Sequence, residues 1–156
     1  MPKIELRERR QKDLEQCVNA LRLVHEADGY PMVWPSDPVR WLSPDQMLRG
    51  WVAVTRTDAP VGHVLLRTTQ DPETLEISRL FVSPTARGQG LGAALLGRAR
   101  EWAAERDLRL ELEVVADERS HAIALYESAG WRRAGTVTAE WTGPDGGCVQ
   151  LHRYTC

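Results

Sequence analysis

Residues 80–93 read Leu80-Phe81-Val82-Ser83-Pro84-Thr85-Ala86-Arg87-Gly88-Gln89-Gly90-Leu91-Gly92-Ala93 and carry the clearest structural signal in the sequence. The apolar run that ends at Val82 is typical of a buried strand, whereas the apolar residues from Leu91 onward recur at helical spacing. Between the two patterns, three glycines let successive backbone N–H groups point into one concavity at the start of the helix. Together with the positive end of the helix dipole, this loop predicts a site for an anion such as a pyrophosphate.

The spacing of the glycines does not identify the loop without its context. A nucleotide-binding P-loop requires Gly-Lys-Ser/Thr, but Gly92 is followed by two alanines. Gly88, Gly90 and Ala93 match the dinucleotide fingerprint G-x-G-x-x-G/A literally. That fingerprint belongs to a fold with a very tight turn after the strand and two βαβαβ halves, whereas here a longer connection with Pro84 leads into a single βαβ unit. We therefore reject both loop types.

The rest of the chain predicts further strands and helices around this βαβ unit. Residues 108–114 alternate between apolar and polar, so the glycine loop and its helix connect two strands. An amphipathic helix is expected to stop at Gly29, and Asp117 or Ser120 is expected to cap a second helix that ends before Gly130. The other expected segments are strands at 4–7, 51–55, 61–66, 75–82, 131–141 and 149–154, and an aromatic, proline-rich loop at 30–44.

The expected fold class is α/β (α+β), with a mixed, mainly antiparallel twisted sheet of about six or seven strands flanked by about four helices. One domain is expected over residues 1–156, because this length suits a single core. The formal net charge of −2 argues against a nucleic-acid-binding surface, and no apolar run approaches the length of a membrane span. Cys17, Cys148 and Cys156 are too few and too scattered for a disulfide framework or a zinc site, which predicts a metal-free protein of the reducing cytoplasm.

The glycine loop also resembles a known family. Arg87, Gly90 and Gly92 match the pattern Gln/Arg-x-x-Gly-x-Gly/Ala of the acetyl-coenzyme A loop in the Gcn5-related N-acetyltransferases, the GNAT family. Residues 80–84 are similar to that family's fourth strand, and residues 122–131 are similar to its second motif. Outside residues 76–131 the similarity is in element order only. This chain departs from the family in the second motif, where the family often carries an asparagine and this chain has Arg119. The neighbouring Ser120 is a second candidate to take the place of that asparagine, and neither residue is assigned the role.

The resemblance implies the GNAT fold and acetyl-coenzyme A (acetyl-CoA) as the acyl donor. Backbone groups of Leu80, Phe81 and Val82 would pair with the pantetheine arm, and one N–H would polarise the thioester carbonyl. The pyrophosphate would bind the loop made of Arg87, Gly88, Gln89, Gly90, Leu91, Gly92 and Ala93. The competing interpretation is an ordinary strand-to-helix turn without a ligand.

Two side chains are candidates for catalysis. By the same resemblance, Tyr126 would protonate the departing thiolate, since a phenol with a pKa of about 10 holds its proton at neutral pH. Glu76 stands where some family members carry a glutamate that takes the proton of the amine through water. The alternatives are core packing for Tyr126 and a solvated strand charge for Glu76.

The acceptor side is less specified. The resemblance places Tyr30 and Trp34, in the aromatic loop, beside the thioester as substrate contacts. The predicted function is transfer of acetyl from acetyl-CoA to a primary amine of a small molecule or a protein N-terminus by direct attack. The alternative is a catalytically silent acyl-CoA-binding or regulatory domain of the same fold. Neither nucleic acid nor a membrane is an expected partner. The sequence does not decide between a monomer and a homodimer.

Overall fold

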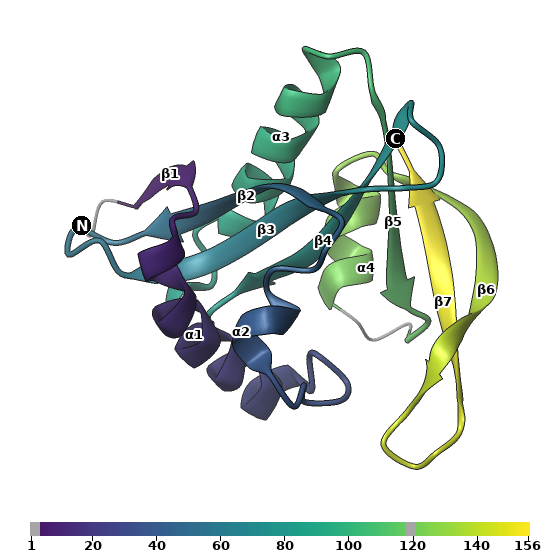
Figure 1. Ribbon diagram of the computed structural model, residues 1–156, viewed down its shortest axis with the longest axis horizontal. Helices are drawn as coiled ribbons and strands as arrows, with labels where there is room; N and C mark the ends of the chain where they lie inside the picture. The colour runs from purple at the N-terminus through teal and green to yellow at the C-terminus, as the bar shows by residue number, and fades with distance from the viewer. Residues whose placement is uncertain (1–3, 118–120) are drawn as a thin grey trace.

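A computed structural model describes residues 4–117 and 121–156 (Figure 1). Within these residues one seven-stranded sheet has the order β1-β2-β3-β4-β5-β7-β6. Neighbouring strands are antiparallel except β4 and β5, which run parallel. The strands are β1 (Glu5–Glu8), β2 (Met47–Val54), β3 (Pro60–Thr68), β4 (Thr74–Val82), β5 (Arg109–Val115), β6 (Arg132–Thr142) and β7 (Cys148–Thr155).

Helices cover both faces of this sheet. On one face lie α1 (Leu14–Asp28) and α2 (Pro38–Trp41), and on the other lie α3 (Leu91–Ala104) and α4 (His121–Ser128) (Figure 1). The 3-10 turns η1 (Gln11–Asp13) and η2 (Pro84–Ala86) precede α1 and the glycine loop. No helix within the described residues is long and apolar enough to cross a membrane.

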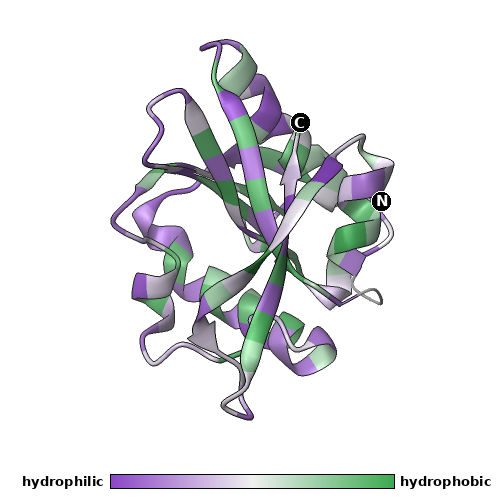
Figure 2. Ribbon diagram, turned by 90° about the vertical axis from the view of Figure 1, so that its right-hand side faces the viewer, coloured by the Kyte–Doolittle hydropathy of each residue, from purple (hydrophilic) through white to green (hydrophobic). Residues whose placement is uncertain are grey.

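Each face of the sheet has its own apolar core. Ala53 of β2 shares a core with Leu95 of α3, whereas the preceding residue, Val52, shares a core with Leu21 of α1. Successive strand residues point to opposite faces, so one strand serves both cores. In Figure 2, several strands show this alternation of apolar and polar residues as successive green and purple bands. The predicted fold class, a mixed sheet flanked by helices, is confirmed.

The sheet opens between its two parallel strands. Residues Thr74–Ile77 of β4 pair with Arg109–Leu112 of β5, and the pairing ends there although both strands continue. In Figure 1, β5, β7 and β6 accordingly stand at a steep angle to β2 and β3. The second half of β4 therefore has one edge on β3 and one edge that no described strand covers.

The aromatic loop differs from its expectation in one respect. Residues Pro38–Trp41 form the short helix α2 within it. Pro38 occupies the first turn, and the Asp37 carboxylate accepts the N–H of Arg40 at 3.1 Å, so both start signals are local. The hydrophobic periodicity of the sequence does not reveal α2, because a helix of one turn is too short for the pattern to repeat.

Ser120, an expected cap of α4, lies outside the described residues, as does Arg119.

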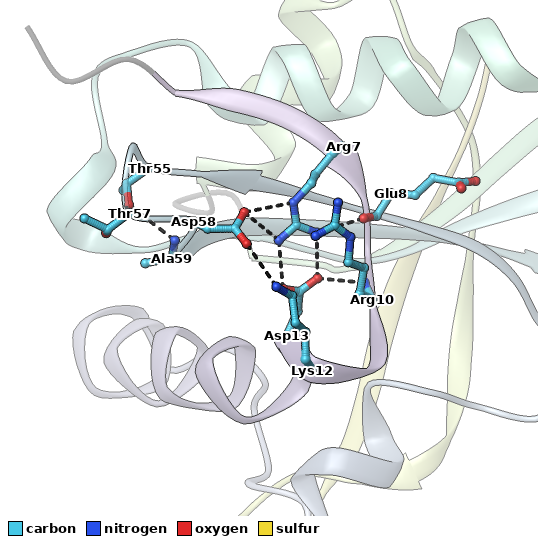
Figure 3. Close-up of polar contacts among 9 residues, drawn as sticks. All are labelled: Arg7, Glu8, Arg10, Lys12, Asp13, Thr55, Thr57, Asp58 and Ala59. Carbon is cyan, nitrogen blue, oxygen red and sulfur yellow. Dashed lines mark hydrogen bonds and ion pairs between the residues drawn. The ribbon is translucent and has the colours of Figure 1, made fainter.

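An arginine at the first strand ties the N-terminal segment to the rest of the sheet (Figure 3). Arg7 donates to both carboxylate oxygens of Asp13, at 2.8 and 2.9 Å, and to Asp58 at 2.9 Å. Asp13 is buried, and its hydrogen bonds with Arg7 lower the pKa of its carboxyl. This forked contact joins β1, the start of α1 and the turn between β2 and β3.

Candidate active site

The glycine loop presents a row of free backbone donors. Gly88 and Gly90 have φ values of +79° and +72°, a region that suits glycine because it has no Cβ. No backbone N–H from Gly88 to Ala93 donates a hydrogen bond to another described residue. The first turn of α3 follows directly, so its unpaired N–H groups add to the same concavity. The arrangement fits the predicted anion site.

A glycine is needed at the third position of the loop for a different reason, which is the packing of two helices. Gly92 lies inside α3, and a Cβ added there would stand 3.1 Å from Cδ2 of Leu125 in α4. The missing side chain therefore lets the two helices approach closely. This contact brings the glycine loop and the second motif together at one end of the sheet.

Arg87 does not point its guanidinium freely into the loop. Its Nη1 donates to Oδ1 of Asp28 at 3.2 Å, and Nη2 pairs with the other oxygen of the same carboxylate. Asp28 is the last residue of α1, so this ion pair joins the glycine loop to the start of the aromatic loop. A bound pyrophosphate would compete with Asp28 for Arg87.

The open edge of β4 begins at a β-bulge. The register with β3 shifts between His63 and Leu65, and Arg79 has a left-handed φ of 55°. Beyond the bulge, the N–H of Ser83 donates to Val61 of the β3 edge at 2.7 Å. Because successive N–H groups of a strand point to opposite edges, those of Val82 and Leu80 point away from β3, toward the uncovered side. These are the backbone groups predicted to meet the pantetheine arm.

A buried polar pair holds this bulge. His63 is fully buried, and its Nδ1 lies 2.8 Å from the carbonyl oxygen of Arg79. Nη1 of Arg9 lies 2.9 Å from Nε2 of the same ring. A guanidinium can only donate, so Nε2 accepts and Nδ1 carries the proton that binds the carbonyl. The strained φ of Arg79, which costs on the order of 1 kcal/mol, is held by this hydrogen bond.

Acidification should destabilise the protein because His63 is buried in its neutral form. Burial lowers the pKa of His63 to about 3 from its ordinary 6.5, so between these values the unfolded chain binds a proton that the folded chain does not. This contribution to stability is complete above pH 6.5 and is lost as the pH falls toward 3. We expect the free energy of unfolding to drop between pH 6.5 and 4.5 by up to about 1.4 kcal/mol per pH unit, measured by urea denaturation.

The control for this prediction is His63→Gln. Its unfolding free energy should show a flatter pH dependence over the same window, whatever its absolute stability. The lowered pKa of Asp13 keeps that carboxyl outside this window, and Glu76, whose pKa is raised, is present in both proteins, so the difference between the two slopes isolates His63. Equal slopes for both proteins would contradict the assignment.

Tyr126 of α4 belongs to the apolar core on the α3 side of the sheet. Its ring packs 6.3 Å from Trp131 and 6.1 Å from Tyr154, and the residue is 6% exposed. The hydroxyl makes no hydrogen bond with another described residue. Burial raises the pKa of Tyr126, and the phenol of Tyr30 adds to this. Tyr126 therefore keeps its proton at neutral pH, which its predicted role as a proton donor requires.

Glu76 of β4 is partly buried, with 26% of its side chain exposed. Its carboxylate is 3.7 Å from Arg67, and it stands opposite Glu111 in the parallel pairing. Burial raises the pKa of Glu76, Arg67 opposes this, and Glu113 and Glu111 raise it further. A carboxyl whose pKa is raised toward neutrality is a stronger base than a solvated one.

The two predicted acceptor contacts have different surroundings. Tyr30 is packed 6.1 Å from the ring of Trp41, and burial raises its pKa to about 12. Trp34 packs on α1 instead, 5.3 Å from His25 and under the guanidinium of Arg22. The substrate contacts of Tyr30 and Trp34 both stay predictions, because the contacts of each within the described residues are with other parts of the protein.

Sequence reasoning missed Arg9, His63 and Arg79. They belong to three different segments, and no local pattern marks them. The one signal was a histidine inside the apolar run of β3, which a strand interior tolerates only with partners. In the part of the chain that the structure describes, no three His, Cys, Asp or Glu side chains gather as a metal-binding group.

Comparisons with known proteins agree with this geometry. The model of the acetyltransferase (GNAT) family matches residues 14–131. Peptidyl-lysine N-acetyltransferase YjaB of Escherichia coli is 31% identical over 99 residues, covering 64% of this chain and 58% of YjaB. N-acetylaspartate synthetase of Danio rerio is 34% identical over 94 residues, covering 60% of this chain and 33% of that protein. The matched region thus spans less than two thirds of either relative.

The fold is found in solved structures as well. Arabidopsis thaliana NAA60 in complex with acetyl-CoA superimposes with a TM-score of 0.77 at 18% identity, covering 99% of this chain and 98% of the other. This likeness concerns the fold. The family match includes β4, the glycine loop and α4, which together build the candidate site. This chain belongs to the acetyltransferase (GNAT) family.

Proposed function

We propose that this protein is an N-acetyltransferase that transfers an acetyl group from acetyl-CoA to a primary amine by direct attack of the amine. The observation that carries the proposal is the uncovered edge of β4, which ends in a glycine loop whose N–H groups have no partner in the described chain. Family membership supports it, as does the acetyl-CoA bound to NAA60. A single domain over residues 1–156 would contain the whole site.

Each part of the site has a role in this proposal. When bound, acetyl-CoA supplies an acetyl group activated as a thioester. The N–H groups of the loop would hold the pyrophosphate, and those of Leu80 and Val82 would be the donors available to the pantetheine arm and to the thioester carbonyl. A backbone donor aimed at a developing oxyanion lowers the barrier by roughly 3 to 4 kcal/mol. Tyr126 keeps a proton at its hydroxyl for the departing sulfur, and Glu76 takes the proton of the amine.

The cysteines favour direct attack over a covalent acyl-enzyme. Cys17 is buried, and burial raises the pKa of its thiol to about 12, so little thiolate is present at neutral pH. Cys148 and Cys156 are exposed free thiols, which suits the proposed location in the reducing cytoplasm.

The proposal is tested by release of free CoA from acetyl-CoA across a broad panel of amines, with mass spectrometry of the products. We expect at least one amine to gain an acetyl group. Tight CoA binding without turnover on any amine would instead support a silent acyl-CoA-binding domain. Stabilisation by nicotinamide dinucleotides but not by CoA would refute the site.

Removing the proposed base should slow the reaction and change its pH profile. We expect Glu76→Gln to lower kcat roughly 100-fold, with a near-normal KM for acetyl-CoA, because only the proton transfer from the amine is lost. In the unmodified protein, kcat/KM should fall as acidification protonates Glu76, at a higher pH than for a solvated glutamate.

Glu113→Gln is the matched control for that variant. Glu113 raises the pKa of Glu76 without being the proposed base. The control should keep its activity while the acid limb of its profile moves to lower pH. If both variants have the same modest effect, Glu76 is a strand charge rather than a base.

A further inference from the structure

Arg79 is held in place on nearly every side while part of its guanidinium stays unused. Its Nε donates to the carbonyl of Trp41 at 3.1 Å, and its guanidinium carbon lies 4.1 Å from the centre of that indole ring. Nη1 donates to the hydroxyl of Ser78 at 3.1 Å, and His63 holds the backbone carbonyl. Nη2 makes no hydrogen bond with a described residue. The cation is therefore preorganised, with donors to spare.

This cation also lacks a counter-ion. Within residues 4–117 and 121–156, no carboxylate lies within 4.0 Å of the Arg79 guanidinium. The charged groups that face it are Glu76, Arg67 and, when ionised, Tyr30, and burial lowers the pKa of Arg79. A partly buried cation without a paired anion is costly. Such an arrangement is typical of a site whose anion arrives with the ligand.

Arg79 lines an open, solvent-facing cavity of about 400 Å³ beside α2. This volume is in the range of small-molecule sites. Arg40, which also lacks an ion pair with a described residue, lines the same cavity together with Ser43 and Gln46. Asp37 and Asp45 line it too, and Asp37 caps α2 through the N–H of Arg40. A lining with charges of both signs suits a zwitterion better than a dianion.

The cavity adjoins the proposed reaction centre. Arg79 directly precedes Leu80, whose N–H points to the open edge of β4. Glu76, the proposed base, lies on the same strand close enough to act electrostatically on Arg79. We propose that this cavity is the acceptor subsite and that Arg79 binds the carboxylate of a small free amino acid while its amine is directed to the thioester. This inference rests on the proposed acetyl transfer and specifies its acceptor class.

The test uses the full chain with the proteinogenic amino acids and their carboxamides, which keep the amine and lose the carboxylate. Acetyl transfer is read as kcat/KM, and binding in the presence of CoA is read by calorimetry. We expect at least one amino acid to exceed its carboxamide by roughly 10- to 100-fold in both readouts, the range of a charge-assisted hydrogen bond. Arg79→Gln should remove this preference through the KM for the acceptor, and Arg79→Lys should restore part of it.

Arg49→Gln is the matched control, because Arg49 is a strand arginine that lies 5.8 Å from the ring of Trp102 but outside the cavity. It should retain the full carboxylate preference. The proposed subsite would be overturned if the carboxamides bound and reacted as well as the amino acids, or if Arg79→Gln weakened amino acids and carboxamides equally. In either case, acetylation of the carboxamides would still support the proposed function. Arg79-dependent binding of an amino acid without any acetyl transfer would uphold the subsite and reject the proposed function.

Discussion

Gly90→Asp is expected to abolish binding of CoA while the protein stays folded. Gly90 is the N-cap of α3 at φ +72°, and a Cβ there would meet nothing within 4 Å, so the added side chain fits and the backbone strain costs about 1 kcal/mol. The aspartate would place a negative charge among the N–H groups that are proposed to hold the pyrophosphate. Loss of the helix-end attraction together with the new repulsion should weaken CoA at least about 100-fold in calorimetry.

Two further variants separate the causes of that loss. Gly90→Ala adds the strain without the charge, and we expect most of the affinity for CoA to remain. Gly97→Asp makes the same chemical change on an exposed position of α3, where nothing lies within 4 Å. It should bind CoA normally. Unchanged affinity in Gly90→Asp would remove the loop from the site.

Tyr126→Phe is expected to lower kcat roughly 100-fold with near-normal affinity for acetyl-CoA. The hydroxyl makes no hydrogen bond with a described residue, so its removal should leave stability almost unchanged. What it removes is a neutral phenol, held protonated by burial, that is proposed to give its proton to the departing sulfur. The measurement is steady-state kinetics beside thermal unfolding.

Tyr154→Phe provides the opposite pattern in a neighbouring ring. The Tyr154 hydroxyl donates to Glu127 at 2.8 Å and accepts from Nη2 of Arg133 at 3.1 Å. Its loss should lower stability by about 1 to 2 kcal/mol and leave kcat near normal. Full activity of Tyr126→Phe would return Tyr126 to a packing role.

The backbone of the proposed donor side could be predicted from the sequence because it is formed by one continuous segment. The φ values of Gly88 and Gly90, the start of α3 and the cap of η2 all follow from residues within a few positions of one another. Glycine supplies a left-handed backbone wherever it stands, so a contiguous loop can be recognised before the fold is known. The alternation of residues 108–114 predicted β5 for the same reason.

The proposed acceptor side depends on contacts between segments that are distant in the sequence. Arg9 and His63 are 54 positions apart, and Arg79 and Trp41 are 38 apart. No pattern along the chain indicates that these groups meet. Likewise, the contact between Trp34 and His25 of α1 could not be predicted from the aromatic loop alone.

The division has one physical reason. Backbone conformation is governed by neighbouring side chains and their sterics, so the sequence by itself determined the strand, the glycine loop and the helix, and through their motif the resemblance to the family. The lowered pKa of His63, the position of the Arg79 guanidinium against Trp41 and the open edge of β4 all arise from contacts and burial that the folded chain creates. Those properties exist only once the sheet is assembled, and they are the ones that bear on the identity of the acceptor.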